Sequence, residues 1–120
     1  MHIETELSDK VNRYLDLATA QVKITAANMA NVDTPGYKTI GMDFEAEMRN
    51  AIKDVNNDQP NEQVHVGLID GLISRPDGNN VSMDHESMKM AEAQLKFKTG
   101  VSMLRSEYQR VLNAIHVTEK

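Results

Sequence analysis

The side chains of this chain that could do chemistry are its histidines, acids and serines, and their spacing decides what they could do. The histidines are His2, His65, His85 and His116, and no two of them lie at metal-ligand spacing. Asp84, His85 and Glu86 are adjacent, but adjacent residues of a helix point in different directions, so we expect a solvated helical turn there. The sequence therefore predicts no metal site and no cofactor.

Nucleophilic catalysis has no better support. The chain contains no cysteine, which excludes disulfides, thiolate metal sites and cysteine catalysis. Serines occur in the last third, in a helical context that lacks the glycine-framed turn of serine hydrolases; they are Ser82, Ser87, Ser102 and Ser106. We therefore predict that the protein is not an enzyme.

Composition and charge exclude two further classes of partner. The chain has 120 residues, which suits one domain, and a net charge of −5, so it lacks the basic footprint of a nucleic-acid-binding protein. No apolar run approaches the ~20 residues that a membrane-spanning helix needs, so we expect no insertion into a membrane. The N-terminus shows no basic region followed by an apolar core, and we expect no cleaved secretory signal.

Residues 1–33 are predicted to form an N-terminal helix. Small or apolar residues recur there at intervals of three and four, the period of one helix face. This N-terminal stripe consists of Leu7, Val11, Tyr14, Ala18, Val22, Thr25, Met29 and Val32. Ser8 or Asp9 could cap the start of the helix.

The end of this helix is specified residue by residue. Asn31 and Asp33 have side chains that bond nearby backbone and tolerate left-handed dihedrals. Thr34 is disfavoured in the helical region because a proline follows it. Pro35 and Gly36 suit the two central positions of a type II turn from Thr34 to Tyr37.

Residues 34–83 form a mixed middle region. Asp43 suits the N-terminus of a short amphipathic helix over residues 44–55, and residues 54–62 are polar and rich in turn formers, as in a loop. Asp70 and Gly71 lie between two apolar pairs, which predicts a β-hairpin with short arms.

Residues 84–120 are predicted to form a C-terminal helix. Its apolar stripe, again spaced by three and four, consists of Met90, Ala93, Phe97, Val101, Leu104, Tyr108, Val111 and Ile115. Asp84 is a suitable N-cap. Gly100 lies in the interior of this helix and costs about 1 kcal/mol relative to alanine, which makes it a weak point.

The lengths of the two terminal helices indicate the fold class. Each would reach or exceed the ~35 Å diameter of a compact domain of this size, so the molecule should be elongated. We predict a mainly α fold in which the terminal helices form an antiparallel helical hairpin or coiled coil beside a small irregular middle region.

One such helix alone is marginally stable, and even the pair leaves apolar residues outside the contact between the helices. These residues are Leu15, Leu17, Ile24, Met103 and Leu112. They could face neighbouring subunits, and we expect the termini to be weakly ordered in the monomer and ordered by polymerisation.

The segment AANMANVDTPGYK, residues 26–38, resembles the signature of bacterial flagellar rod proteins, in which an N-terminal helix ends in an Asn-rich turn. The short chain, the segment MDFE at residues 42–45 and the segment DGNNVSMDHE at residues 77–86 are similar to the proximal rod subunits of that family. The resemblance implies a structural, helix-ending role for Asn28, Asn31, Thr34, Pro35, Gly36 and Tyr37.

The resemblance also implies a function in the flagellar basal body. A protein of this kind polymerises with copies of itself and with other rod subunits into the drive shaft that crosses the periplasm. It adjoins the MS ring and its rod adaptor protein, and it leaves the cytoplasm through the flagellar type III export apparatus without a cleaved signal. Another short rod subunit is the nearest alternative. A soluble coiled-coil adaptor or export chaperone is a third, although a simple bundle has no need of the turn signature.

Overall fold

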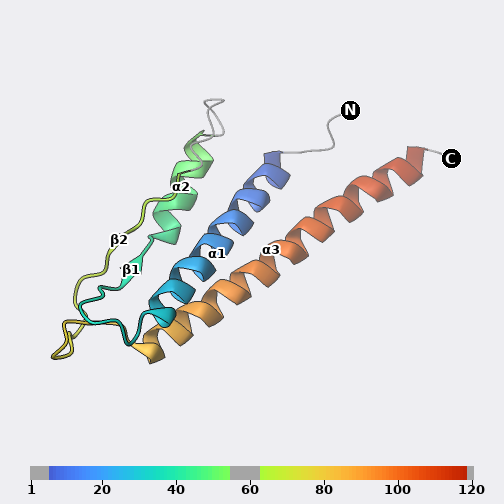
Figure 1. Ribbon diagram of the computed structural model, residues 1–120. Helices are drawn as coiled ribbons and strands as arrows, with labels where there is room; N and C mark the ends of the chain where they lie inside the picture. Colours follow the sequence, from blue (N-terminus) through green and yellow to red (C-terminus); the bar gives the residue numbers. More distant parts are fainter. Residues whose placement is uncertain (1–5, 55–62, 119–120) are drawn as a thin grey trace.

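Three helices and a two-stranded sheet make up the part of the chain that the computed structural model describes, residues 6–54 and 63–118 (Figure 1). In chain order the elements are α1 (Glu6–Ala30), β1 (Ile40–Gly41), α2 (Phe44–Asp54), β2 (Gly67–Leu68) and α3 (Met83–Thr118). Residues 55–62, which hold most of the predicted polar loop, lie outside the described residues.

The two long helices run antiparallel. The chain enters α3 close to the point where it leaves α1, and α3 then runs back along α1 and continues past its start (Figure 1). At 1.5 Å per residue α1 is ~37 Å long and α3 is ~54 Å long. The molecule measures 71 × 28 × 18 Å, which confirms the elongated helical hairpin predicted from the sequence.

Small residues allow α1 and α3 to approach closely. Ala18 and Ala93 are fully buried, and a Cβ atom at Gly100 would lie 2.6 Å from Leu15 Cδ2. Gly100 therefore has a packing role in addition to its cost in helix propensity, because any larger residue would force the side chain of Leu15 to shift.

Leu17 is a correction to the sequence prediction. The sequence places it partly outside the contact between the two long helices and free to face a neighbouring subunit, whereas its side chain is fully buried within this chain. That expectation considered α3 alone as the packing partner, but α1 also contacts α2 and β1. Leu15 and Ile24 are half-buried, and Met103 and Leu112 are 47% and 50% exposed.

Of the N-cap residues predicted for the three helices, one is confirmed. Asp43 caps α2, because its Oδ1 accepts a hydrogen bond from the Ala46 N–H at 3.1 Å. Asp84 does not cap α3: the helix begins one residue earlier, and Ser82 Oγ accepts from the His85 N–H at 3.3 Å. Ser8 and Asp9 do not cap α1, since the helix is already formed at Glu6.

The sheet differs from the predicted hairpin. β1 and β2 pair antiparallel, with Ile40 opposite Leu68 and Gly41 opposite Gly67. Gly71 does turn the chain, with a φ of +84°, but no strand follows it in residues 72–82. The arms around Asp70 and Gly71 are too short and too poorly alternating to pair with each other, and β2 pairs instead with a strand from much earlier in the chain.

Within residues 6–54 and 63–118, no helix is both long enough and apolar enough to cross a lipid bilayer.

Candidate functional site

The turn that ends α1 has the predicted geometry. Gly36 has a φ of +76°, as the third residue of a type II turn requires, and the Tyr37 N–H donates to the Thr34 carbonyl oxygen at 3.2 Å. Thr34 Oγ1 donates to Asn31 Oδ1 at 3.0 Å, and Asn31 Nδ2 donates to the Ala27 carbonyl oxygen at 2.7 Å. Asn31 thus satisfies a carbonyl of the last helical turn and fixes the threonine that leads into the proline.

Asn28 joins α1 to the sheet. Its Nδ2 donates to the Ile40 carbonyl oxygen at 2.8 Å, and its Oδ1 accepts from the Ile40 N–H at 3.1 Å. Asn28 therefore contacts both backbone groups of Ile40, as a neighbouring strand would. The side chain is 1% exposed, so these bonds lie away from solvent.

The remaining hydrogen-bonding capacity of Asn28 is also used. Its Nδ2 donates a second bond to Glu86 Oε2 at 3.1 Å, and its Oδ1 accepts a second bond from the Tyr37 hydroxyl at 3.0 Å. A carboxamide offers two N–H groups and two lone pairs, so all four positions are occupied. Any other residue type at this position would leave buried polar groups without partners, which is costly.

Tyr37 is held in its neutral form. Burial of the ring and the nearby negative charge of Glu86 both raise the pKa of the Tyr37 hydroxyl above its ordinary value of 10.0. The protonated hydroxyl is the form that can donate to Asn28, so the acid of α3 supports the hydrogen bond within the turn.

Asn79 contacts the same turn although it lies far from it along the chain. Its Nδ2 donates to the carbonyl oxygens of Asn31 and Thr34, at 2.8 Å each, and its Oδ1 accepts from the Val81 N–H at 2.8 Å. Asn79 is fully buried. It therefore satisfies carbonyls that the end of α1 leaves without a helical partner.

The residues around Asn79 complete this contact. Asn80 Oδ1 accepts from both the backbone N–H of Thr39, at 2.7 Å, and the Thr39 hydroxyl, at 2.8 Å. The Gly36 N–H donates to the Asp77 carbonyl oxygen at 2.9 Å, and the Arg75 guanidinium donates to the carbonyl oxygens of Val32 and Val81. Residues 75–81 thus form hydrogen bonds with backbone groups of residues 31–39.

We call the set Asn28, Tyr37, Asn79, Asn80 and Glu86 the asparagine junction. The signature residues Asn28, Asn31, Thr34 and Tyr37 lie together in or beside it, whereas Pro35 and Gly36 form the exposed tip of the turn. In the sequence this segment stood out only through the family resemblance of residues 77–86, without any predicted contact. The asparagine pair directly after Asp77 and Gly78 was the available signal, because buried asparagines commonly bond backbone groups.

The predicted apolar stripes are unevenly covered. In α1, Val11 and Ala18 are buried, Tyr14, Val22 and Met29 are half-buried, and Leu7 is exposed. In α3, Met90, Val101, Leu104 and Val111 are half-buried, and Phe97, Tyr108 and Ile115 are exposed. Their use in assembly stays a prediction.

Residues 6–54 and 63–118 contain no candidate metal site, because no three histidines or acids lie close enough together there to hold an ion. The arrangement consists of hydrogen-bonded amides, hydroxyls and backbone groups. Such a site can hold segments in fixed positions, which is a structural role.

Comparison with known proteins supports the resemblance to flagellar rod proteins. The family described as "Flagella basal body rod protein" matches residues 15–38, which include the end of α1 and the turn. The chain is 29% identical to the flagellar basal body rod protein FlgB of Salmonella typhimurium, over 84% of this chain and 86% of the relative. It is 29% identical to FlgB of Borrelia hermsii, over 86% and 90%, and 25% identical to FlgB of Escherichia coli, over 84% and 86%. The matched signature and the matched length together confirm the resemblance to flagellar basal body rod proteins of the FlgB type.

Proposed function

We propose that this chain is a structural subunit of the proximal rod of the bacterial flagellar basal body. The observation that carries the proposal is the asparagine junction, which places the family signature at the turn between α1 and the sheet and against the start of α3. The similarity to FlgB proteins over most of the chain supports the same role.

The shape suits a filament subunit. Two long antiparallel helices give the molecule a stiff axis, and α3 carries large apolar side chains that the described chain leaves exposed; they are Met83, Met88, Leu95, Phe97, Met103, Tyr108, Leu112, Ile115 and Val117. Different surfaces that meet head to tail build an open helical assembly, which can transmit torque along its length. We propose that the two apolar stripes make these contacts, and that residues 1–33, 34–83 and 84–120 act as the three working regions.

The finer statements about partners and location belong to the same proposal. We infer that the chain contacts other rod subunits, and that it adjoins the MS ring and its rod adaptor protein. We also infer that it reaches the basal body through the flagellar type III export apparatus without a cleaved signal, and that it has no catalytic activity.

A deletion and complementation experiment tests the function. In the source bacterium the gene is deleted and replaced by the wild type, by a chain lacking residues 1–32, by Asn28→Ala, or by Asn12→Ala. Asn12 is an exposed asparagine of α1 outside the junction, so its variant is the matched control. We expect wild type and Asn12→Ala to restore rods and motility, and the other two to fail. Complete rods in the deletion strain would contradict the proposal.

Purified protein separates the remaining alternatives. A rod subunit should form open-ended assemblies with other rod proteins. The position of the chain along the assembled rod then distinguishes a proximal subunit from another short rod subunit. A small closed oligomer that dissociates when other rod proteins are added would indicate an adaptor or export chaperone.

A further inference from the structure

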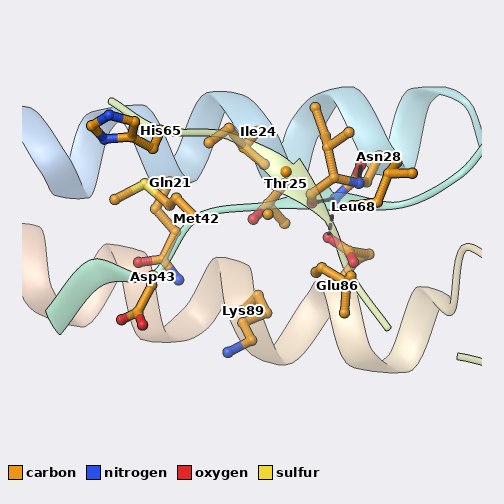
Figure 2. Close-up of a pocket in the computed structure, with 14 residues that line it drawn as sticks. Gln21, Ile24, Thr25, Asn28, Met42, Asp43, His65, Leu68, Glu86 and Lys89 are labelled. Carbon is orange, nitrogen blue, oxygen red and sulfur yellow. Dashed lines mark hydrogen bonds between the residues drawn. The ribbon is translucent and has the colours of Figure 1, made fainter. Parts of the chain in front are cut away.

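A pocket lies between the two long helices and the sheet (Figure 2). Its volume is about 360 Å³, at the lower end of the ~300–1,000 Å³ typical of ligand pockets. Its apolar lining includes Ile24 of α1, Met42 beside β1 and Ile69 beside β2. Thr25 and Glu86 contribute polar groups to the same space (Figure 2).

Glu86 is the unusual member of this lining. Its side chain is 2% exposed, and its Oε2 accepts the hydrogen bond from Asn28. Among the described residues, no donor contacts its Oε1 and no cation forms an ion pair with it. No fully buried side-chain oxygen in that part of the chain lacks a partner, so Oε1 must reach the open space of the pocket.

The bases that line the pocket each lie against another acid. Lys89 Nζ lies 3.7 Å from Glu92 Oε2, and His65 Nδ1 lies 3.0 Å from Glu47 Oε1. Asp43, the other lining acid, caps α2 and adds negative charge. A buried carboxylate without a cation is unfavourable, and a positive group that enters the pocket would relieve this cost.

We propose that this pocket binds the lysine or arginine side chain of a neighbouring protein chain, with its charged head on Glu86 Oε1 and its methylene stem against Ile24, Met42 and Ile69. Long basic side chains pack their stems on apolar surface and keep their heads on polar groups. A guanidinium or ammonium group supplies the N–H donors that a half-used carboxylate lacks. The choice of a protein partner rests on the proposed function, because a rod subunit works in contact with other chains.

The test uses the full-length chain in solution and four probes at matched ionic strength. n-Butylguanidinium and n-butylammonium carry the head and stem of the two side chains, and n-butylurea is a neutral match for the first. The peptide acetyl-Ala-Arg-Ala-amide presents the side chain as a protein would. Binding is followed by amide and methyl NMR shifts and by nuclear Overhauser contacts from the butyl methylenes to Ile24, Met42 and Ile69.

Two variants separate Glu86 from a general effect of negative charge. Glu86→Gln removes the charge and keeps an oxygen that can accept from Asn28, and Asp84→Asn removes an exposed acid of the same helix that does not line the pocket. Hydrogen bonds to charged groups typically change affinity by about tenfold or more. We therefore expect the cations and the peptide to bind about tenfold more weakly to Glu86→Gln and within about twofold of wild type to Asp84→Asn.

The wild-type chain alone is sufficient if Glu86→Gln does not fold. Butylurea should then bind about tenfold more weakly than butylguanidinium, with contacts from the guanidinium stem to the three named side chains. Equal binding of the two, or the absence of those contacts, would overturn the proposal. Binding of the free cations but not of the peptide would overturn it in favour of a small amine. These results do not depend on motility, so this proposal and the proposed function fail separately.

Discussion

The ammonium nitrogen of Lys96 lies 3.9 Å from the centre of the Phe44 ring. The same nitrogen donates to Gln21 Oε1 at 3.4 Å, and Phe44 makes an edge-to-face contact with Tyr14 at 5.2 Å between ring centres. These four residues connect all three helices, with Tyr14 and Gln21 on α1, Phe44 on α2 and Lys96 on α3. The cluster holds α2 against the helical hairpin at a distance from the asparagine junction.

Lys96→Met should weaken this connection without removing its apolar stem. Cation–π contacts contribute about 0.5–2 kcal/mol depending on how far they are desolvated, and we expect a loss of about 1 kcal/mol in the free energy of unfolding. Urea denaturation followed by circular dichroism measures it. Lys98→Met, at an exposed position of the same helix, is the control and should change the stability little. An equal loss in both variants would mean that the ring contact contributes nothing.

Gly100→Ala should destabilise the protein although alanine is the better helix former. Helix propensity favours alanine by about 1 kcal/mol, but the added Cβ would lie 2.6 Å from Leu15 Cδ2 and 3.1 Å from Tyr14 Cδ1. Overpacking of this kind costs about 1–3 kcal/mol, so we expect a net loss of about 1 kcal/mol in thermal or urea unfolding.

A double variant identifies the cause of that loss. In a Leu15→Ala background, where the colliding methyl groups are absent, Gly100→Ala should become neutral or stabilising. Thr99→Ala, at the exposed neighbouring position, should be slightly stabilising in either background. A stabilising Gly100→Ala in the wild-type background would refute the close contact between the two helices.

Asn79→Ala should be among the most damaging substitutions in the chain. It removes the acceptor for the Val81 N–H at a fully buried position and the N–H donors to the carbonyl oxygens of Asn31 and Thr34, which keep their backbone partners in the turn. An unsatisfied buried group costs about 1–3 kcal/mol, and a loss in that range is expected in chemical denaturation. Asn50→Ala, at an exposed position of α2, should stay near wild type and serves as the control.

Tyr37 should make the stability fall at alkaline pH. Burial and Glu86 raise the pKa of its hydroxyl in the folded state above the 10.0 of the unfolded chain, so the folded state binds the proton more tightly. This contribution is fully present below pH 10.0 and is lost as the pH rises through the folded-state pKa.

Tyr37→Phe is the variant that tests this pH dependence. It should cost about 1 kcal/mol at neutral pH through the lost bond to Asn28 and should flatten the alkaline decline measured by urea denaturation. Burial also raises the pKa of Tyr14, so Tyr14→Phe should remove a separate part of the decline. An unchanged alkaline profile in Tyr37→Phe would contradict the assignment.

Amide hydrogen exchange should divide α3 into two parts. The start of the helix packs against α1 and the asparagine junction, whereas Tyr108, Leu112 and Val117 are 50%, 50% and 75% exposed. We expect slow exchange near Glu86 and Ala93 and fast exchange after Tyr108 in the dilute monomer, with protection of the second part on polymerisation. Full protection of residues 108–118 in the dilute monomer would contradict ordering by assembly.

Local chemistry was predictable from the sequence. The type II turn at Pro35 and Gly36 and the Asp43 cap depend on residues within four positions of each other, and both are confirmed. The elongated helical hairpin followed from apolar spacing and helix length, which are also local properties.

Long-range pairings were not predictable in the same way. The contact of Asn79 with Asn31 and the pairing of β2 with β1 join groups that lie far apart in the chain and leave no periodic trace in the sequence. The packing role of Gly100 was not predictable for a related reason, because propensity describes the helix alone and not the side chain of Leu15 that lies over it.

The contact between Asn28 and Glu86 has a consequence for the order of events in folding. The first third of the sequence completes the hydrogen bonds of its own turn only when Asn79, Asn80 and Glu86 arrive, so a chain of which only the first half has emerged lacks these bonds. A polypeptide threaded through a narrow conduit from its N-terminus would therefore lock this turn only after Glu86 had passed, well beyond the middle of the chain.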